Sequence, residues 1–354
     1  MRTTSSSTSS SDAMKPLDLA ESRTWRRFAA GFALTAAGLL AGYLALAALV
    51  DPYDSGRSRL LSAGGVRPQG PRTAAASRGR DPAFTGAIIG NSHIQLIEPG
   101  RLSASTGVPF VQLAVPATGP GEQFLLLDWY LRHHPNPAAL VVAADAYWCT
   151  DDPALPNAKP FPFWLFSDSV PAYLRGLMRF SVAQEVAGRI GWLLRGRRAY
   201  ARADGWWDYE PDYLRQGYAD DPRLVADRDK PAPDAPDPGR AGPFPAAERF
   251  AALLARVPAA TPVLLVFPPV YAPGLPRPGT PRAAAEEACK DAVRAALGTH
   301  PVSAVLDWRR DRPELHDSAQ FFDQTHYRHP LAHQLTDAIG ASLRRLLQWK
   351  PRPE

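Results

Sequence analysis

Short apolar segments alternate with amphipathic ones from Phe84 onward, and this alternation limits the fold more than any other feature of the chain. Strands are expected over residues 86–89, 109–114, 140–144, 262–267 and 302–306. Helices are expected over residues 121–132, 245–256, 281–297 and 330–347. Strands that alternate with helices form a mostly parallel sheet covered on both faces, so the strands themselves are apolar throughout. The sequence therefore predicts a three-layer α/β domain over residues 83–348.

An uncharged run precedes this domain. Residues 28–50 are apolar throughout, and a helix of about 20 such residues spans a bilayer. Arginines precede the run and aspartates follow it, so the positive-inside rule places residues 1–27 in the cytoplasm and the domain outside. A cleaved signal peptide is the alternative, since residues 45–47 have the small-x-small form, but the run exceeds a usual signal core of about 7–15 residues. We predict an uncleaved single-pass anchor in the inner (cytoplasmic) membrane, with a periplasmic or extracellular C-terminal domain.

Composition divides the rest of the chain. Residues 1–27 are polar and rich in Ser and Thr, which predicts a disordered tail, and residues 51–82 resemble a linker in their Gly, Arg, Ser and Pro content. Residues 148–242 interrupt the alternation with tryptophans and many prolines, and we interpret them as an insertion that forms a lid or binding cap. Its aromatic rings suit either stacking on sugars or packing of a small subdomain. Residues 180–198 are amphipathic, which fits either a helix on the membrane surface or a solvated helix.

Charge and cysteine content restrict the partners and the compartment. The formal net charge is +5 and the basic residues are scattered, so we expect no nucleic-acid partner. The two cysteines, Cys149 and Cys289, lack metal-type spacing and permit one disulfide in an oxidising compartment. Nothing in their spacing forces a pair, so we expect that they are not an essential cross-link.

A candidate nucleophile and its base stand at opposite ends of the domain. The strand at residues 86–89 runs into a Gly-Asn-Ser turn, and such a turn exposes its serine, Ser92, at the carboxyl edge of a parallel sheet. Among eight histidines His326 has the best context, because Asp323 lies three residues before it in the loop that leads to the last helix. Both loops leave the sheet at the same edge. We therefore expect Asp323 to orient His326, and His326 to face Ser92 as its base.

The turn at residues 89–93 and the Asp-x-x-His-Tyr phrase at residues 323–327 resemble the SGNH hydrolase superfamily. The layout of the chain, with a short tail, one N-terminal helix and then this domain, is similar to that of the membrane-anchored branch of the superfamily. This branch includes the alginate O-acetylation proteins and the D-alanine transfer protein of teichoic acid synthesis. Asp-Pro-Tyr at residues 51–53 and Pro-Leu-Ala at residues 330–332 carry the same likeness. It covers about residues 28–348 and implies a flavodoxin-like SGNH fold.

The chain departs from the superfamily where the oxyanion is held. The first block is commonly Gly-Asp-Ser, whereas here Asn91 replaces the aspartate and either turns inward to help or only shapes the turn. The glycine of the second block matches Gly119 best, with Gly121 as the alternative, and its N–H would hold the oxyanion. The third block supplies an asparagine, but here Asp145 comes after the strand, where it contacts substrate or caps the next segment of the chain. Loss of one such donor costs roughly 10²–10³ in rate.

The resemblance implies an O-acyltransferase or esterase that acts on acyl groups, above all acetyl, of an envelope or exported polysaccharide. It also implies a multi-spanning membrane acyltransferase as partner, with neither an organic cofactor nor a metal. We expect His93 to pack behind the serine loop, and His329 and His333 to form no metal site, because no Glu or Cys accompanies them. The alternative is an inactive SGNH-like scaffold or glycan-binding component, favoured by the absent asparagine and the aromatic insertion.

Overall fold

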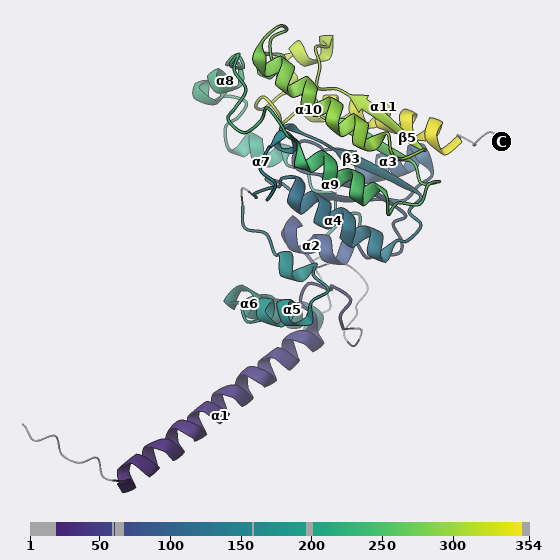
Figure 1. Ribbon diagram of the computed structural model, residues 1–354. Helices are drawn as coiled ribbons and strands as arrows, with labels where there is room; N and C mark the ends of the chain where they lie inside the picture. The colour runs from purple at the N-terminus through teal and green to yellow at the C-terminus, as the bar shows by residue number, and fades with distance from the viewer. Residues whose placement is uncertain (1–18, 59, 61–66, 158, 196–200, 349–354) are drawn as a thin grey trace, which may run out of the picture.

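The computed structural model describes residues 19–58, 60, 67–157, 159–195 and 201–348. One long helix, α1 (Leu19–Val50), leads into an α/β domain (Figure 1). It is long and apolar enough to cross a membrane, a test that a signal sequence near the N-terminus also passes. Because α1 begins at Leu19, residues 19–27 of the predicted tail are helical, as good helix formers next to an apolar helix allow. Residues 1–18 of that tail lie outside the described residues.

Five parallel strands form the sheet, in the order β2-β1-β3-β4-β5. They are β1 (Gly86–Gly90), β2 (Phe110–Ala114), β3 (Ala139–Ala143), β4 (Val263–Phe267) and β5 (Ser303–Asp307). Every residue of β1 to β4 is buried, whereas β5 at the edge is only partly covered. The predicted α/β class and all five predicted strands are confirmed, because continuous apolar runs are stable only between two helical layers.

Helices cover both faces of the sheet (Figure 1). Residues of α4 (Pro120–His133), α9 (Pro245–Leu254) and α10 (Pro281–Leu297) pack on one face with Ala87, Leu140 and Leu265. Residues of α3 (Pro99–Thr106) and α11 (His329–Gln348) pack on the other, with Ile88, Val141 and Leu264. Alternate residues of each strand thus enter two separate cores. Proline starts α3, α4, α9 and α10, where its fixed φ suits the first helical turn.

The two irregular regions contain further helices. The predicted linker holds α2 (Pro71–Arg78), whose buried alanines 74–76 pack under the domain, so this part of it is ordered core and not a loose connection. The insertion holds α5 (Val170–Leu177), α6 (Phe180–Leu194), α7 (Glu210–Arg215) and α8 (Pro222–Arg228). Short 3-10 helices complete the fold at Ala146–Cys149, Phe163–Leu165, Ala272–Gly274, Pro313–His316 and Ser318–Gln320. The insertion divides, since α5 and α6 lie beside the end of α1 while α7 and α8 lie at the α/β domain, away from α1 (Figure 1).

A disulfide joins Cys149, at the end of the 3-10 helix after β3, to Cys289 in the middle of α10. The two cysteines are 140 positions apart in the chain, and their Cα atoms are 5.5 Å apart. Sequence spacing offers no reason to pair them, but the fold brings the β3 loop and α10 together over one face of the sheet. The expectation that the pair is not an essential cross-link therefore loses its basis.

Candidate active site

Ser92 lies in the turn that follows β1, at the carboxyl edge of the sheet. A side chain at Gly90 would come within 2.7 Å of Ile94 and 3.0 Å of Ala143, so the turn needs a glycine there. Because β2 and β3 lie on opposite sides of β1, the chain leaves β1 at the point where the strand order reverses. Open α/β sheets bind their ligands in the crevice at such a switch point.

The structure brings Ser92, His326 and Asp323 into one line. Nε2 of His326 is 2.9 Å from the Ser92 hydroxyl oxygen, and Nδ1 of His326 is 2.7 Å from Oδ2 of Asp323. An ionised carboxylate only accepts hydrogen bonds, so Nδ1 carries the proton and Nε2 is left to accept the serine proton. This is the geometry expected of a nucleophile, its base and the group that orients the base.

Asp323 also shapes the loop that carries the histidine. Its Oδ1 accepts the backbone N–H groups of Thr325 and His326, both at 2.8 Å. The phenol of Tyr327 donates to the backbone oxygen of His93 at 2.9 Å and so ties this loop to the serine loop. The pairing of Asp323 with His326 thus depends on contacts within one loop and not on Ser92.

Burial and hydrogen bonding have opposite effects on the pKa of Asp323 and on that of His326. Burial raises the pKa of Asp323, but the hydrogen bond from His326 and the two backbone N–H groups outweigh it and hold that pKa at about 2. Burial lowers the pKa of His326, and the attraction of Asp323 offsets only part of this. Tyr209 and Tyr213, before and in α7, cover the imidazole with ring centroids 5.5 and 4.9 Å away. At neutral pH, the pair is a carboxylate beside a neutral imidazole, ready to accept a proton.

A second histidine–aspartate pair lies beside the first. Nδ1 of His93 is 3.0 Å from Oδ2 of Asp145, and the ring centroid of His93 is 5.2 Å from that of His326. The buried Asp145 also accepts from the amide of Asn91 and from the backbone N–H of Tyr147. Burial raises the pKa of Asp145, but the hydrogen bonds from His93 and Asn91 prevail and keep it below the usual range. Asp145 thus holds the serine loop and caps the 3-10 helix after β3.

The residues expected to hold an oxyanion are already engaged. The N–H of Gly119 donates to Oε2 of Glu122 at 3.0 Å, and the Asn91 amide donates to Asp145 and, at 3.1 Å, to the backbone oxygen of Thr118. Among the described residues the backbone N–H of Ser92 has no hydrogen-bond acceptor, so it is a free donor next to the hydroxyl. The binding roles of Gly119, Asn91 and Asp145 stay predictions.

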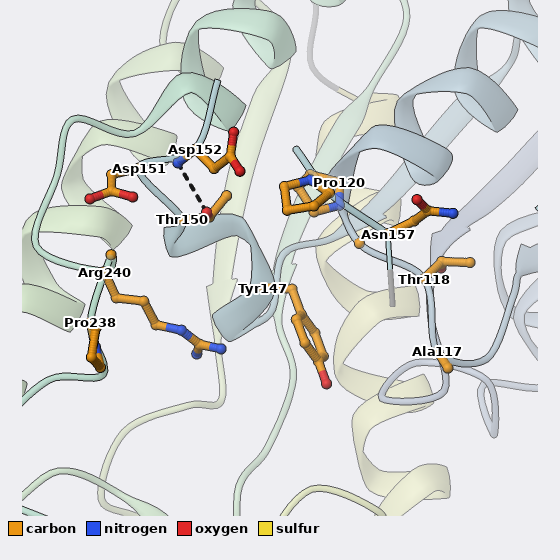
Figure 2. Close-up of a pocket in the computed structure, with 13 residues that line it drawn as sticks. Ala117, Thr118, Pro120, Tyr147, Thr150, Asp151, Asp152, Asn157, Pro238 and Arg240 are labelled. Atoms are coloured by element: carbon orange, nitrogen blue, oxygen red, sulfur yellow. Dashed lines mark hydrogen bonds between the residues drawn. The ribbon is translucent and has the colours of Figure 1, made fainter. Parts of the chain in front are cut away.

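A hollow of about 470 Å³ opens between the loops that follow β2 and β3 (Figure 2). Tyr147 stands in its middle, with Arg240, Asp151 and Asp152 on one side and Asn157 on the other. Two residues that line the hollow connect it to the serine loop. The backbone oxygen of Thr118 accepts from the Asn91 amide, and the backbone N–H of Tyr147 donates to Asp145, which also binds Asn91. The hollow therefore flanks the crevice in which Ser92 lies.

Sequence patterns do not predict two sets of contacts in this site. The sequence suggests only a substrate contact or a cap for Asp145, because its bond to His93 depends on how far β1 and β3 are apart. Tyr209 and Tyr213 belong to the insertion, and no local signal in the sequence places them on His326. His329, expected to bind no metal, lies 2.9 Å from Asp208.

Comparison with known proteins adds no family to this picture. No protein-family model matches the chain, and no curated protein matches it. What identifies the protein is thus its own architecture: an α/β domain with a five-stranded parallel sheet, preceded by one long apolar helix.

Proposed function

We propose that the protein is a membrane-anchored, extracytoplasmic SGNH-like enzyme that transfers or removes an acyl group, above all acetyl, on an envelope or exported polysaccharide. The observation that carries the proposal is the unbroken hydrogen-bonded line from the Ser92 hydroxyl through His326 to Asp323. It lies at the switch point of the sheet, where a substrate can reach it.

The chemistry has two stages. The Ser92 oxygen attacks the carbonyl carbon of an acyl donor while Nε2 of His326 takes the serine proton, and Asp323 holds the imidazolium that forms. The free N–H of Ser92 steadies the oxyanion of the tetrahedral intermediate. The leaving group takes the proton from His326 and departs, which leaves an ester on Ser92. A glycan hydroxyl or a water then gives its proton to His326 and attacks this ester. The Ser92–acyl bond breaks, the Ser92 oxygen takes the proton back from His326, and the acylated glycan or the free acid departs.

The hollow beside the serine loop supports a carbohydrate acceptor. The exposed ring of Tyr147 offers an apolar face to a sugar, while Asp151, Asp152 and Asn157 accept or donate hydrogen bonds to hydroxyl groups. Two carboxylates against one guanidinium, that of Arg240, favour a neutral sugar over a uronic acid. A polysaccharide acceptor therefore fits both the size and the lining.

Two features support a location outside the cytoplasm. The rest of the protein covers little of the uncharged part of α1, as expected of a helix that spans a bilayer, and the arginines lie before it. The disulfide between Cys149 and Cys289 is of a kind that persists in oxidising compartments. A single-pass anchor with the domain on the outer side accounts for both, and a multi-spanning acyltransferase in the same membrane would deliver the acyl group.

A fluorophosphonate probe tests the proposal directly. It should label the full-length protein on Ser92, and Ser92→Ala should abolish labelling. Ser105→Ala is the matched control, because Ser105 lies in α3 away from the site and its variant should label normally. Absence of labelling in the wild-type protein would favour the second candidate, an inactive glycan-binding scaffold, which the engagement of the Gly119 N–H by Glu122 supports.

A further inference from the structure

The hairpin of α5 and α6 packs against the last turns of α1 (Figure 1). The Tyr43 phenol in α1 donates to the backbone oxygen of Leu177 at 2.8 Å. From Arg23 to Gly42 every residue of α1 is exposed, whereas Ala47 and Val50 are buried under the domain. The hairpin therefore joins α1 where the helix passes from exposed to covered.

The position of Tyr43 sets the depth of this contact if α1 spans the membrane. Tyr43 follows Phe28, the first residue of the uncharged run, by fifteen positions, or about 22 Å along a helix. The hydrocarbon core of a bilayer is about 30 Å thick. With the run starting at one boundary, Tyr43 lies inside the opposite one. A segment bonded to Tyr43 must then lie at the outer membrane interface.

The outward face of the hairpin is apolar. Val170 and Leu174 on one side of α5 and Met178 directly after it are exposed, with Val170 at 58% and Met178 at 51%. Phe180 and Leu194, at the two ends of α6, are 79% and 82% exposed. The exposed residues of α6 between these two ends are small or uncharged: Ser181, Gln184, Ala187 and Gly188. Large exposed apolar side chains around such a surface mark an interaction site.

The two charged residues of α6 pair with residues that precede the domain. Glu185 pairs with Arg67, and a guanidinium nitrogen of the buried Arg189 lies 3.7 Å from Oδ1 of Asp54. Between Phe180 and Leu194 the helix has no other charged residue. A helix in water usually exposes its charged residues, whereas the fully exposed residues of α6 are all uncharged and its one arginine is buried. Such an outer face is the one expected at a boundary with lipid.

We infer that the α5–α6 hairpin lies in the outer interface of the membrane that α1 crosses, with its apolar face among the lipid acyl chains. The exposed Arg175 and Arg179 flank this face, where they can reach lipid phosphates. The lipid surface is favoured as occupant because the apolar face continues the lipid-facing surface of α1. The inference depends on α1 as a span and not on the chemistry of Ser92.

Depth-dependent quenching in nanodiscs tests the inference with the full-length protein. Both native cysteines are in the disulfide, so Phe180→Cys and Leu194→Cys each provide one free thiol for an environment-sensitive fluorophore. We expect nanodisc lipids that carry a spin label near the carbonyl group to quench both sites at least twofold, and aqueous iodide to quench them little. Glu248→Cys, exposed on α9 of the domain, is the control and should respond only to iodide.

Two outcomes would overturn the inference. Quenching of the Phe180 and Leu194 sites by iodide and not by lipid would show that the hairpin faces water. Protection from both quenchers, together with energy transfer between labelled copies, would show that a second copy of the chain covers the face. Two positions at opposite ends of α6 keep the test decisive if one label disturbs the local packing.

Discussion

The imidazoles of His93 and His326 stand 5.2 Å apart, centroid to centroid, and each is bonded to its own aspartate. Only His326 reaches the Ser92 hydroxyl, whereas His93 is held behind the serine loop by Asp145. Two histidines in one site therefore have separate tasks. His93, next to Ser92 in sequence, bonds to Asp145, and His326, distant in sequence, is the residue that we propose as the base.

The proposed reaction should lose rate in acid at an unusually low pH. Burial lowers the pKa of His326 below the ordinary value of 6.5, and only the neutral imidazole can take the Ser92 proton. We expect kcat/KM for a small ester to be level near neutrality and to fall as pH drops through a pKa below 6.5. A profile from about pH 4 to pH 8 measures this, and an acid limb above the ordinary value would contradict it.

Removal of the serine or of its base should have nearly the same effect. We expect Ser92→Ala and His326→Ala each to lower kcat by roughly 10⁴-fold or more, and the double variant to lose little beyond that, because the residues act as a unit. His333→Ala, at an exposed histidine of α11, is the matched control and should keep the wild-type rate. Additive losses in the double variant would show that His326 does not act on Ser92.

The aromatic ring in the hollow should matter for the acceptor and not for the nucleophile. We expect Tyr147→Ala to raise KM for a neutral oligosaccharide acceptor by roughly tenfold, equivalent to about 1.4 kcal/mol. Fluorophosphonate labelling of Ser92 should not change. Phe163→Ala, which removes an exposed ring outside the hollow, should leave both quantities as they are.

Loss of the Asp145 carboxylate should destabilise the protein. Asp145→Ala removes one of the two acceptors of the buried Asn91 amide, the acceptor of the Tyr147 N–H and the partner of the His93 ring, so the free energy of unfolding should fall by about 3 kcal/mol. Denaturant unfolding in detergent measures this. The free energy of unfolding of Asp220→Ala, at an exposed position, should stay within about 0.5 kcal/mol of that of the wild type. An equal effect of both variants would show that the hydrogen bonds of Asp145 do not stabilise the fold.

The disulfide should be worth a large part of the stability. Reduction or the double variant Cys149→Ser and Cys289→Ser should lower the free energy of unfolding by about 2–5 kcal/mol, since the cross-link closes a long loop. Wild-type protein in reductant should match the double variant. If neither treatment changes the unfolding midpoint, the cross-link is dispensable after all.

Sequence patterns predicted the sheet well because buried parallel strands have to be apolar on both faces. The helix expected over residues 281–297 has the observed bounds, since Thr280 caps its start and Gly298 follows its end. The Asp323 and His326 pair was predictable because its geometry is local.

Contacts between loops were not predictable in the same way. The bond from Asp145 to His93 and the disulfide each depend on a distance that only the packed sheet defines. The same limit applies to α2, because three alanines in a Gly- and Arg-rich segment give little periodic signal until the domain packs over them.

Ser92 and His326 are 234 positions apart, so the chain that separates them contains nearly the whole domain. In the proposed location, a molecule that has crossed the membrane only in part has Ser92 outside but not yet His326, its proposed base. The same is true of a molecule from which a protease has removed the segment containing His326. Under the proposed function, the protein would therefore be inert during its own export, and its chemistry would begin only when the loop that holds His326 packs against the turn that holds Ser92.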